Sequence, residues 1–370
     1  MRTFDRPLAA RQIEEAVAQL LPAASASSVR SYLRLNTPGL FVRESRGMYR
    51  LRSTGMPRSA GPMGQSETEW CFGRVSLWRT DCFEWLEARP ERSIHAVVTD
   101  PPYGLHEYTA DQQQKLRAGK GGVWRIPPSF DGHERSPLPR FTTLTEEQLK
   151  DLWSFFHLWG RAILPRLVPG ANVLVASNPL LCHIVGSALS QAGLERRGEI
   201  IRLVTTMRGG DRPKGAHREF AQVSVMPRSM WEPWLMYRKP LEGRVKDNLR
   251  KWKTGGYRRP SEAKPFGDVI KSSPTTKKER DLAPHPSLKP QAFLRKIVHA
   301  VLPLGEGTIL DPFAGSGSTL AAAEAVGYEA LGVEKDAHYF HMACEAIPRL
   351  AALRTEGQPS NLYTQLALSF

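Results

Sequence analysis

Residues 308–318 have the sequence TILDPFAGSGS, in which a short apolar run leads into a glycine-rich turn and the start of a helix-forming stretch. Glycines at positions 315 and 317 allow the backbone to approach a ligand closely, beside the electropositive N-terminus of the following helix. Glu334 ends the next predicted strand, where a carboxylate can accept hydrogen bonds from both hydroxyls of a ribose. This arrangement predicts a nucleoside-type ligand on a doubly wound sheet. A dinucleotide redox cofactor stays open at this point, although Leu320 occupies the place of the third glycine of GxGxxG.

Apolar runs and helical periodicities alternate around this stretch, between residues 73 and 352. Strands are predicted at 75–79, 94–99, 172–177, 199–205, 308–311 and 329–333, and helices at 82–88, 145–166, 179–192, 291–302, 318–326 and 337–352. Such alternation is typical of an α/β fold with a doubly wound, mostly parallel sheet covered by helices. Two long segments, 104–144 and 207–283, interrupt the pattern, and loops of this length in a compact domain are usually functional.

The second decisive motif is Asp100-Pro101-Pro102-Tyr103, at the carboxyl end of the apolar run 94–99, where open α/β sheets bind ligands. An exocyclic amine of adenine or cytosine is a poor nucleophile because its lone pair is delocalised into the ring. The Asp100 carboxylate and the Pro101 carbonyl can each accept one N–H and so hold the nitrogen facing an electrophile. The prolines make this backbone stiff, and the Tyr103 ring can stack on a base flipped out of a duplex.

Both motifs resemble those of the DNA amino-methyltransferases, which transfer a methyl group from S-adenosylmethionine (SAM) to the N6 amine of adenine or the N4 amine of cytosine. DPPY is similar to the catalytic motif of the family, and DPFAGSGS is similar to its SAM-binding FxGxG motif. Two shorter segments agree as well: TDC at 80–82, and HPSLKP at 285–290, which resembles HPTxKP with Ser287 and Leu288 as departures. DPPY precedes FxGxG, as in the circularly permuted β group. The implied fold is a Rossmann-like methyltransferase domain over residues 73–352.

The resemblance also implies the roles of individual residues. The catalytic residues are Asp100, Pro101, Pro102 and Tyr103. The residues that contact SAM are Asp81, Cys82, Asp100, Ser287, Lys289, Asp311, Phe313, Ala314, Gly315, Ser316, Gly317, Ser318, Glu334 and Lys335. Transfer is expected to be direct, so that catalysis consists of positioning and electrostatic stabilisation. No metal is implied, and the four cysteines form no CxxC pair.

Several reactions are compatible with parts of this pattern. An aspartate as first motif residue is commoner among the N6-adenine enzymes of the family, which favours adenine, but both amines present two protons to the same acceptors, so N4-cytosine stays open. C5-cytosine methylation would need a cysteine nucleophile, typically after a proline, and no cysteine here follows one. Methylation of RNA or of a protein amide stays open as well, and so does a catalytically silent DNA-binding regulator.

The charge distribution indicates a polyanionic partner. The chain has 370 residues, with 51 Lys and Arg against 37 Asp and Glu, and a net charge of +14. Residues 1–66 carry ten arginines against four acids, and residues 207–283 carry nineteen basic residues against nine acids. Segment 207–283 lies where β-group relatives insert a target-recognition region, and we expect it to face double-stranded DNA. The candidate DNA contacts are Lys120, Arg125, Arg208, Arg212, Lys214, Arg250, Lys251, Lys253, Arg258 and Arg259.

The remaining segments complete the expected domain organisation. Residues 1–52 combine two predicted helices, at 8–21 and 25–35, with a hairpin over 40–52, and resemble the winged helix-turn-helix modules of restriction-modification proteins; a packing or dimerisation module is the alternative. The other expected boundaries are a linker at 53–72, a catalytic half at 73–206, target recognition at 207–283, a SAM-binding half at 284–352 and a tail at 353–370.

The expected setting follows from composition and resemblance together. No apolar run reaches membrane-spanning length, and the scattered cysteines are typical of a reducing compartment, so we expect a bacterial cytoplasmic, nucleoid-associated protein without a membrane partner. A homodimer and a cognate restriction endonuclease are further partners that the resemblance allows.

Overall fold

The computed structural model of the chain describes residues 8–20, 29, 33, 41–45, 48–51, 68–102, 129–130, 133–134, 145–204, 210–213, 215–285 and 287–355. The chain divides into two compact units, Met1–Gly64 and Gln65–Phe370. Tyr103, Lys120, Arg125, Arg208 and Lys214 lie outside the described residues.

The first unit contains a short sheet and a helix. Strands β1 (Leu8–Ala9), β3 (Met48–Leu51) and β2 (Phe41–Ser45) form an antiparallel sheet in that order, and helix α1 spans Ala10–Leu20. The hairpin predicted over 40–52 is therefore present. Of the helix predicted over 25–35, only Val29 and Leu33 are described, both helical and buried. The winged-helix assignment stays a prediction.

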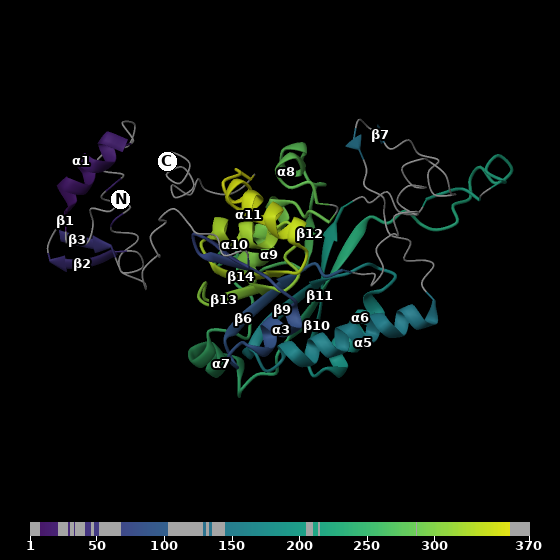
Figure 1. The fold of residues 1–370 in the computed structure, drawn as a ribbon, viewed down its shortest axis with the longest axis horizontal. Coiled ribbons are helices and arrows are strands. Elements are labelled where there is room, and N and C mark those ends of the chain that lie inside the picture. Colours follow the sequence, from purple (N-terminus) through teal and green to yellow (C-terminus); the bar gives the residue numbers. More distant parts are fainter. Residues whose placement is uncertain are drawn as a thin grey trace. The chain divides into compact units, whose positions relative to one another are not determined.

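The second unit is built on a nine-stranded sheet with the order β12-β10-β11-β9-β6-β13-β14-β5-β4 (Figure 1). The strands are β4 (Glu69–Phe72), β5 (Val75–Arg79), β6 (Ile94–Thr99), β9 (Leu167–Ala176), β10 (Glu195–Leu203), β11 (Trp231–Arg238), β12 (Val269–Lys271), β13 (Thr308–Asp311) and β14 (Glu329–Glu334). Strands β9, β6, β13, β14 and β5 run parallel, whereas β11 is antiparallel to both β9 and β10. The mostly parallel α/β fold predicted from the sequence is confirmed.

Helices cover both faces of this sheet. One face packs against α9 (Gln291–Val301), α10 (Ser318–Val326) and α11 (Ala337–Ala351), and the other against α3 (Cys82–Glu87), α5 (Glu146–Ile163) and α6 (Cys182–Gln191). The central strands are apolar because both of their faces are buried; every residue of β9 is buried. Thr145 begins α5 with a reciprocal capping box to Gln148, an interaction that contributes about 1 kcal/mol to helix stability.

The strand directions define two edges of the sheet. Because β10 is antiparallel to β11, and β11 to β9, β10 runs in the same direction as the five parallel strands. Their carboxyl ends, at Arg79, Thr99, Ala176, Leu203, Asp311 and Glu334, lie at one edge, here called the carboxyl edge. Helix α7 (Val245–Trp252) lies at the opposite, amino edge, where Asn248 Nδ2 donates to the carbonyl of Pro169 at 2.9 Å. Figure 1 shows α7 and α8 (Lys277–Leu282) at opposite ends of the sheet.

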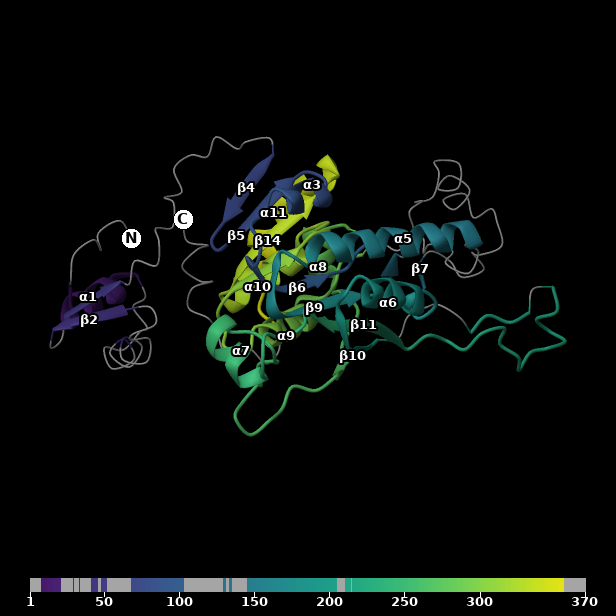
Figure 2. The same cartoon turned by 90° about the horizontal axis from the view of Figure 1, so that it is seen from below.

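Segment 207–283 is not a single insertion. Its strand β11 is a central part of the main sheet, with Trp234, Leu235 and Tyr237 fully buried. The part before β11 leaves the carboxyl edge, and residues 210–213 and 215–230, here called the finger, extend away from β10 and β11 (Figure 2). At its base, Gly210 N donates to Met226 O and Val225 N to Asp211 O, both at 2.8 Å. A further two-stranded pair, β7 (Ser129–Phe130) and β8 (His133–Glu134), lies in segment 104–144.

Candidate active site

The two decisive motifs lie side by side at the carboxyl edge. Strands β6 and β13 pair in parallel, with Leu310 opposite Val97, so that Asp100, directly after β6, lies beside Asp311 at the end of β13. Across this junction Thr99 Oγ1 donates to Asp311 Oδ1 at 2.7 Å. Burial raises the pKa of Asp311 to about 6, against the opposing effect of the hydrogen bonds from Thr99 and Thr319. The strand that carries DPPY is thereby tied to the strand that carries the glycine turn.

The glycine turn leaves little room for side chains at two positions. Gly315 has φ +51°, and a Cβ there would lie 3.0 Å from Nε2 of His285. Gly317, the N-cap of α10, has φ +74°, and its Cβ would lie 2.5 Å from Ile347. Only glycine adopts this backbone without strain and with this packing on both sides. The turn therefore presents its backbone, and the first amides of α10, to the carboxyl edge.

The strand-end acid predicted from the sequence contacts this turn. Glu334 Oε2 accepts a hydrogen bond from Gly315 N at 2.7 Å, and Oε1 accepts one from Asp336 N at 2.7 Å. Burial raises the pKa of Glu334, and these amide hydrogen bonds act in the opposite direction. A carboxylate in this position can exchange amide donors for the hydroxyls of a ribose.

The third candidate segment, TDC at 80–82, directly follows strand β5. Asp81 accepts from Phe83 N at 2.9 Å as the N-cap of α3, and pairs with Lys335 Nζ at 3.0 Å. Burial acts to raise the pKa of Asp81, but the bonds from Lys335 and Phe83 outweigh it, so the pKa is lowered. Burial raises the pKa of Cys82 to about 12, which keeps this thiol neutral at pH 7, and the side chain is buried in the core cluster with Trp85 and Leu86.

The segment between α8 and α9 covers the turn and reaches Asp100. The His285 ring packs edge-on against Tyr339, with centroids 4.5 Å apart, and its Nδ1 accepts from Ser287 N at 3.1 Å. Burial, with the nearby Lys289 charge, lowers the pKa of His285 to about 4, so the ring is neutral at pH 7. Lys289 Nζ forms an ion pair with Asp100 Oδ2, in which both side chains are largely buried.

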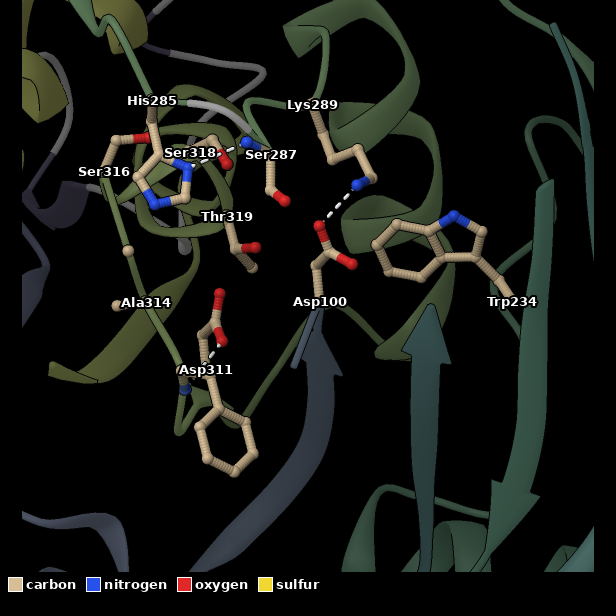
Figure 3. Close-up of a pocket in the computed structure, with 12 residues that line it drawn as sticks. Asp100, Trp234, His285, Ser287, Lys289, Asp311, Ala314, Ser316, Ser318 and Thr319 are labelled. Atoms are coloured by element: carbon tan, nitrogen blue, oxygen red, sulfur yellow. Dashed lines mark hydrogen bonds and ion pairs between the residues drawn. The ribbon is translucent and has the colours of Figure 1, made fainter. Parts of the chain in front are cut away.

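One pocket joins Asp100 and Lys289 to the glycine turn, as Figure 3 shows, whereas Asp81, Cys82, Gly317, Glu334 and Lys335 do not line it. It is lined by Asp100, Trp234, His285, Ser287, Lys289, Asp311, Phe313, Ala314, Gly315, Ser316, Ser318 and Thr319. Asp100 and Lys289 point toward each other on one side, and the turn forms the other. The pocket thus brings together nine of the residues predicted from the sequence: Asp100, Ser287, Lys289, Asp311, Phe313, Ala314, Gly315, Ser316 and Ser318. Pro101 is buried and Pro102 exposed beside it.

Four pocket or near-pocket residues were not predicted as site residues. His285 lies in a motif that the sequence already indicated, so a signal for it existed. Thr99 and Thr319 bond to Asp311, and Trp234 lines the pocket from β11. The contributions of Thr99 and Trp234 depend on strand pairing between distant segments, which the linear pattern does not reveal, whereas Thr319 directly follows the predicted motif.

The predicted DNA contacts fall into two groups. Arg212 is exposed on the finger, which leaves the carboxyl edge. Arg250, Lys251 and Lys253 lie on or next to α7 at the amino edge, where Lys251 pairs with Glu242 at 2.7 Å. Arg258 bonds to Tyr328 OH at 2.6 Å beside the start of β14, also at the amino edge, and Arg259 follows it. The structure does not bring this second group near Asp100.

The residues present fit a nucleoside-type methyl donor. The buried Asp311 and the half-buried Glu334, together with Gly315, whose Cβ would fill the space beside His285, form a cradle of amides and carboxylates. Within the part of the chain that the structure describes, no cluster of three or more His, Cys, Asp or Glu side chains could hold a metal ion. No described helix is long and apolar enough to cross a membrane.

Comparison with known proteins agrees with this geometry. The DNA methylase family N6_N4_Mtase matches residues 94–345. The Type II methyltransferase M2.DpnII of Streptococcus pneumoniae is 24% identical over 270 residues, covering 73% of this chain and 88% of that protein. The Type II methyltransferase M.HindIII of Haemophilus influenzae is 22% identical over 293 residues, covering 72% and 93%.

Among solved structures, a putative DNA modification methylase from Thermus thermophilus, complexed with SAM, is 21% identical, with a TM-score of 0.44, covering 76% of this chain and 95% of that one. The family match covers more than half of this chain. The chain therefore belongs to the N6/N4 DNA methylase family: it is a DNA amino-methyltransferase, and SAM is its methyl donor.

Proposed function

We propose that this enzyme methylates the N6 amine of an adenine flipped out of duplex DNA, at a specific sequence. The observation that carries the proposal is the position of Asp100, whose carboxylate lines the same pocket as the glycine turn. In that turn the Gly315 amide donates a hydrogen bond to Glu334. An aspartate as first residue of this motif is commoner in the N6-adenine enzymes that the sequence resembles. N4-cytosine is the alternative, because its amine offers the same two protons.

The chain's own residues have distinct tasks in this reaction. Asp100 and the Pro101 carbonyl accept the two N–H groups of the target amine, which holds its lone pair toward the pocket and stabilises positive charge that develops on nitrogen. Tyr103 stacks on the flipped base. Asp311, Glu334 and the backbone of Gly315 hold the donor, with Asp81, Lys335 and Ser287 around it. When bound, SAM supplies an electrophilic methyl group on a positively charged sulfur.

We assign the finger to DNA contact. It leaves the carboxyl edge on the same side as Asp100, carries the exposed Arg212, and exposes Phe220, Val225 and Met230. Arginines beside apolar side chains suit a groove of duplex DNA, where the cations contact phosphates and the apolar groups contact base edges. We assign the basic residues on and after α7 to phosphates farther from the target base, which they would reach where the duplex bends around the sheet.

The setting of the enzyme belongs to the same proposal. A winged module at residues 1–52 would add DNA affinity, and a homodimer and a cognate restriction endonuclease are the partners expected in a restriction-modification system. An enzyme that modifies host DNA acts beside the bacterial nucleoid, in the cytoplasm, where its four free cysteines would stay reduced.

The experiment that tests the target base is nucleoside mass spectrometry of DNA from a methylation-deficient bacterium that expresses the chain. N6-methyldeoxyadenosine is the expected product, and long-read sequencing of the same DNA then gives the recognition sequence. Detection of N4-methyldeoxycytidine instead would show that the target base is cytosine. Absence of both, with methyl transfer to RNA or protein instead, would overturn the DNA substrate.

A further inference from the structure

A row of alternating charges runs from Asp100 across the carboxyl edge. Lys289 forms an ion pair with Asp100, its Nζ lies 3.8 Å from Glu232 Oε1, and Glu232 Oε2 accepts from Arg202 Nη1 at 2.9 Å. The exposed side-chain fractions are 14% for Asp100, 12% for Lys289, 19% for Glu232 and 7% for Arg202. The four charges cancel, which is a requirement for burying them together.

Lys289 therefore lies between two carboxylates. It contacts Asp100, while its distance of 3.8 Å from Glu232 Oε1 is within ion-pair range but longer than a hydrogen bond. A displacement of roughly 1 Å would bring it into hydrogen-bond distance of Glu232. The flexible four-carbon stem of a lysine permits such a movement without any backbone change.

Glu232, in contrast, is fixed. Trp234 Nε1 donates to its Oε1 at 2.9 Å, and Arg202 holds its Oε2. Arg202 is itself anchored, because it donates to Ser272 Oγ at 3.0 Å and to the Ser273 carbonyl at 3.2 Å. Arg202 and Glu232 are also direct partners in the pairing of β10 with β11. A fixed acceptor thus stands beside a movable ammonium.

The proposed reaction requires the Lys289 ammonium to move away from Asp100. The target amine must donate to Asp100, the carboxylate that Lys289 contacts, and it becomes positively charged as the methyl group is transferred. An ammonium that stays on Asp100 would compete for that carboxylate and repel the developing charge. Withdrawal toward Glu232 removes both effects and leaves no carboxylate or ammonium unpaired.

We propose that Glu232 is a positioning residue for methyl transfer, whose carboxylate receives the Lys289 ammonium when the target amine binds Asp100. This inference rests on the proposed role of Asp100. It adds a residue outside the recognised motifs, on the strand that returns from the finger.

The test compares Glu232→Gln with Glu232→Asp. Gln keeps the size and the hydrogen bond to Trp234 but removes the charge, whereas Asp keeps the charge with a shorter reach. We expect E232Q to lower kcat about tenfold to a hundredfold, with KM for DNA, and DNA affinity measured without methyl donor, changed by less than about threefold. E232D should retain more activity than E232Q. The matched control is Glu242→Gln, which removes a carboxylate from an exposed ion pair with Lys251 at the amino edge and should leave kcat unchanged.

A second arm separates action through Lys289 from a structural role. In single-turnover assays, adding E232Q to Lys289→Met should change the rate by less than about threefold, because the ammonium that needs a second acceptor is gone. The double variant removes one negative and one positive charge, so the buried row stays neutral. If E232Q alone does not fold, the double variant can therefore still be compared with Lys289→Met. Thermal melting of every variant checks the fold.

Three results would overturn the inference. These are a wild-type kcat in E232Q, a Gln variant more active than the Asp variant, and a rate loss on adding E232Q to Lys289→Met as large as the loss that E232Q causes in the wild type. Failure of the proposed function looks different, since the wild-type enzyme itself would then show no methylation of either base.

Discussion

Thr99 and Asp311, 212 residues apart in the sequence, are joined by a hydrogen bond of 2.7 Å between the ends of adjacent parallel strands. The bond lies where the catalytic motif and the glycine turn begin, so it fixes the spacing of the two halves of the active site. Its acceptor is a fully buried carboxylate, which makes it more important than an average hydrogen bond.

Replacement of Thr99 by Val should therefore destabilise the protein. Valine has the shape of threonine but no donor, so the free energy of unfolding should fall by about 1–3 kcal/mol. Urea denaturation at pH 8, where Asp311 is ionised, measures the loss. It should be smaller at pH 5, where the carboxyl is protonated. Thr80→Val, which removes a more exposed hydroxyl bonded to Glu84, is the control and should cost less than about 0.5 kcal/mol. Equal losses in both variants would contradict this account.

Donor binding should depend on pH through Asp311. Burial raises the pKa of this carboxyl to about 6, and a positively charged donor binds the ionised form better. Affinity should be constant well above pH 6 and weaken as the pH falls through and below 6, up to tenfold per unit. Calorimetric titrations of SAM between pH 5 and pH 8 measure this. In Asp311→Asn the affinity should be lower, and any pH dependence that is left belongs to Glu334, whose pKa burial also raises. An unchanged profile in that variant would rule out Asp311 as the titrating group.

Substitution of Gly315 by Ala should abolish most donor binding. The new Cβ would meet the His285 ring at 3.0 Å, on a backbone with φ +51°. The control is Gly243→Ala, at φ +80° with nothing within 4 Å of the added Cβ. Both variants should lose about 1–3 kcal/mol of stability through backbone strain. Only Gly315→Ala should also weaken SAM binding, by roughly tenfold or more, equivalent to about 1.4 kcal/mol. Normal SAM affinity in Gly315→Ala would show that the turn does not hold the donor.

The two groups of basic residues should differ in their effect on DNA binding. Arg212 leaves the carboxyl edge with the finger, so Arg212→Gln should weaken binding and lower the slope of log affinity against log salt by about 0.9. Arg250 lies on α7 at the amino edge, paired with Asp247 at 3.6 Å, and Arg250→Gln should have the smaller effect. Fluorescence anisotropy at several salt concentrations makes the comparison. A larger effect of Arg250→Gln would place the duplex along the amino edge.

The elements around the glycine turn could be predicted from the sequence because local signals determine them. Strand β13 and helix α10 have the predicted bounds, since an apolar run, two glycines and a helical periodicity follow one another without interruption. Strand β6 also matches, because it is mostly apolar and buried and two prolines follow its end after Asp100. Here the local pattern and the burial in the folded protein agree.

Strand β11 could not be predicted in the same way. Its sequence, WEPWLMYR, contains a proline and two charged residues and lies within a basic segment, so it has no clear alternation. It becomes a core strand because β9 and β10 pair with it on both sides. The positions of Glu232 and Arg202 follow from that pairing, which explains why the charged row beside Asp100 was not visible in the sequence.

The central claim is that Asp100 serves chiefly to hold the target amine, so that its loss abolishes methyl transfer and leaves donor binding largely intact. The most direct measurement compares tritium transfer from labelled SAM to DNA with SAM affinity, for the wild type and Asp100→Ala. We predict that methyl transfer is lost in the variant while SAM affinity stays within about threefold and the melting curve stays cooperative. Retained transfer, or loss of SAM binding equal to the loss of transfer in a folded variant, would contradict the account.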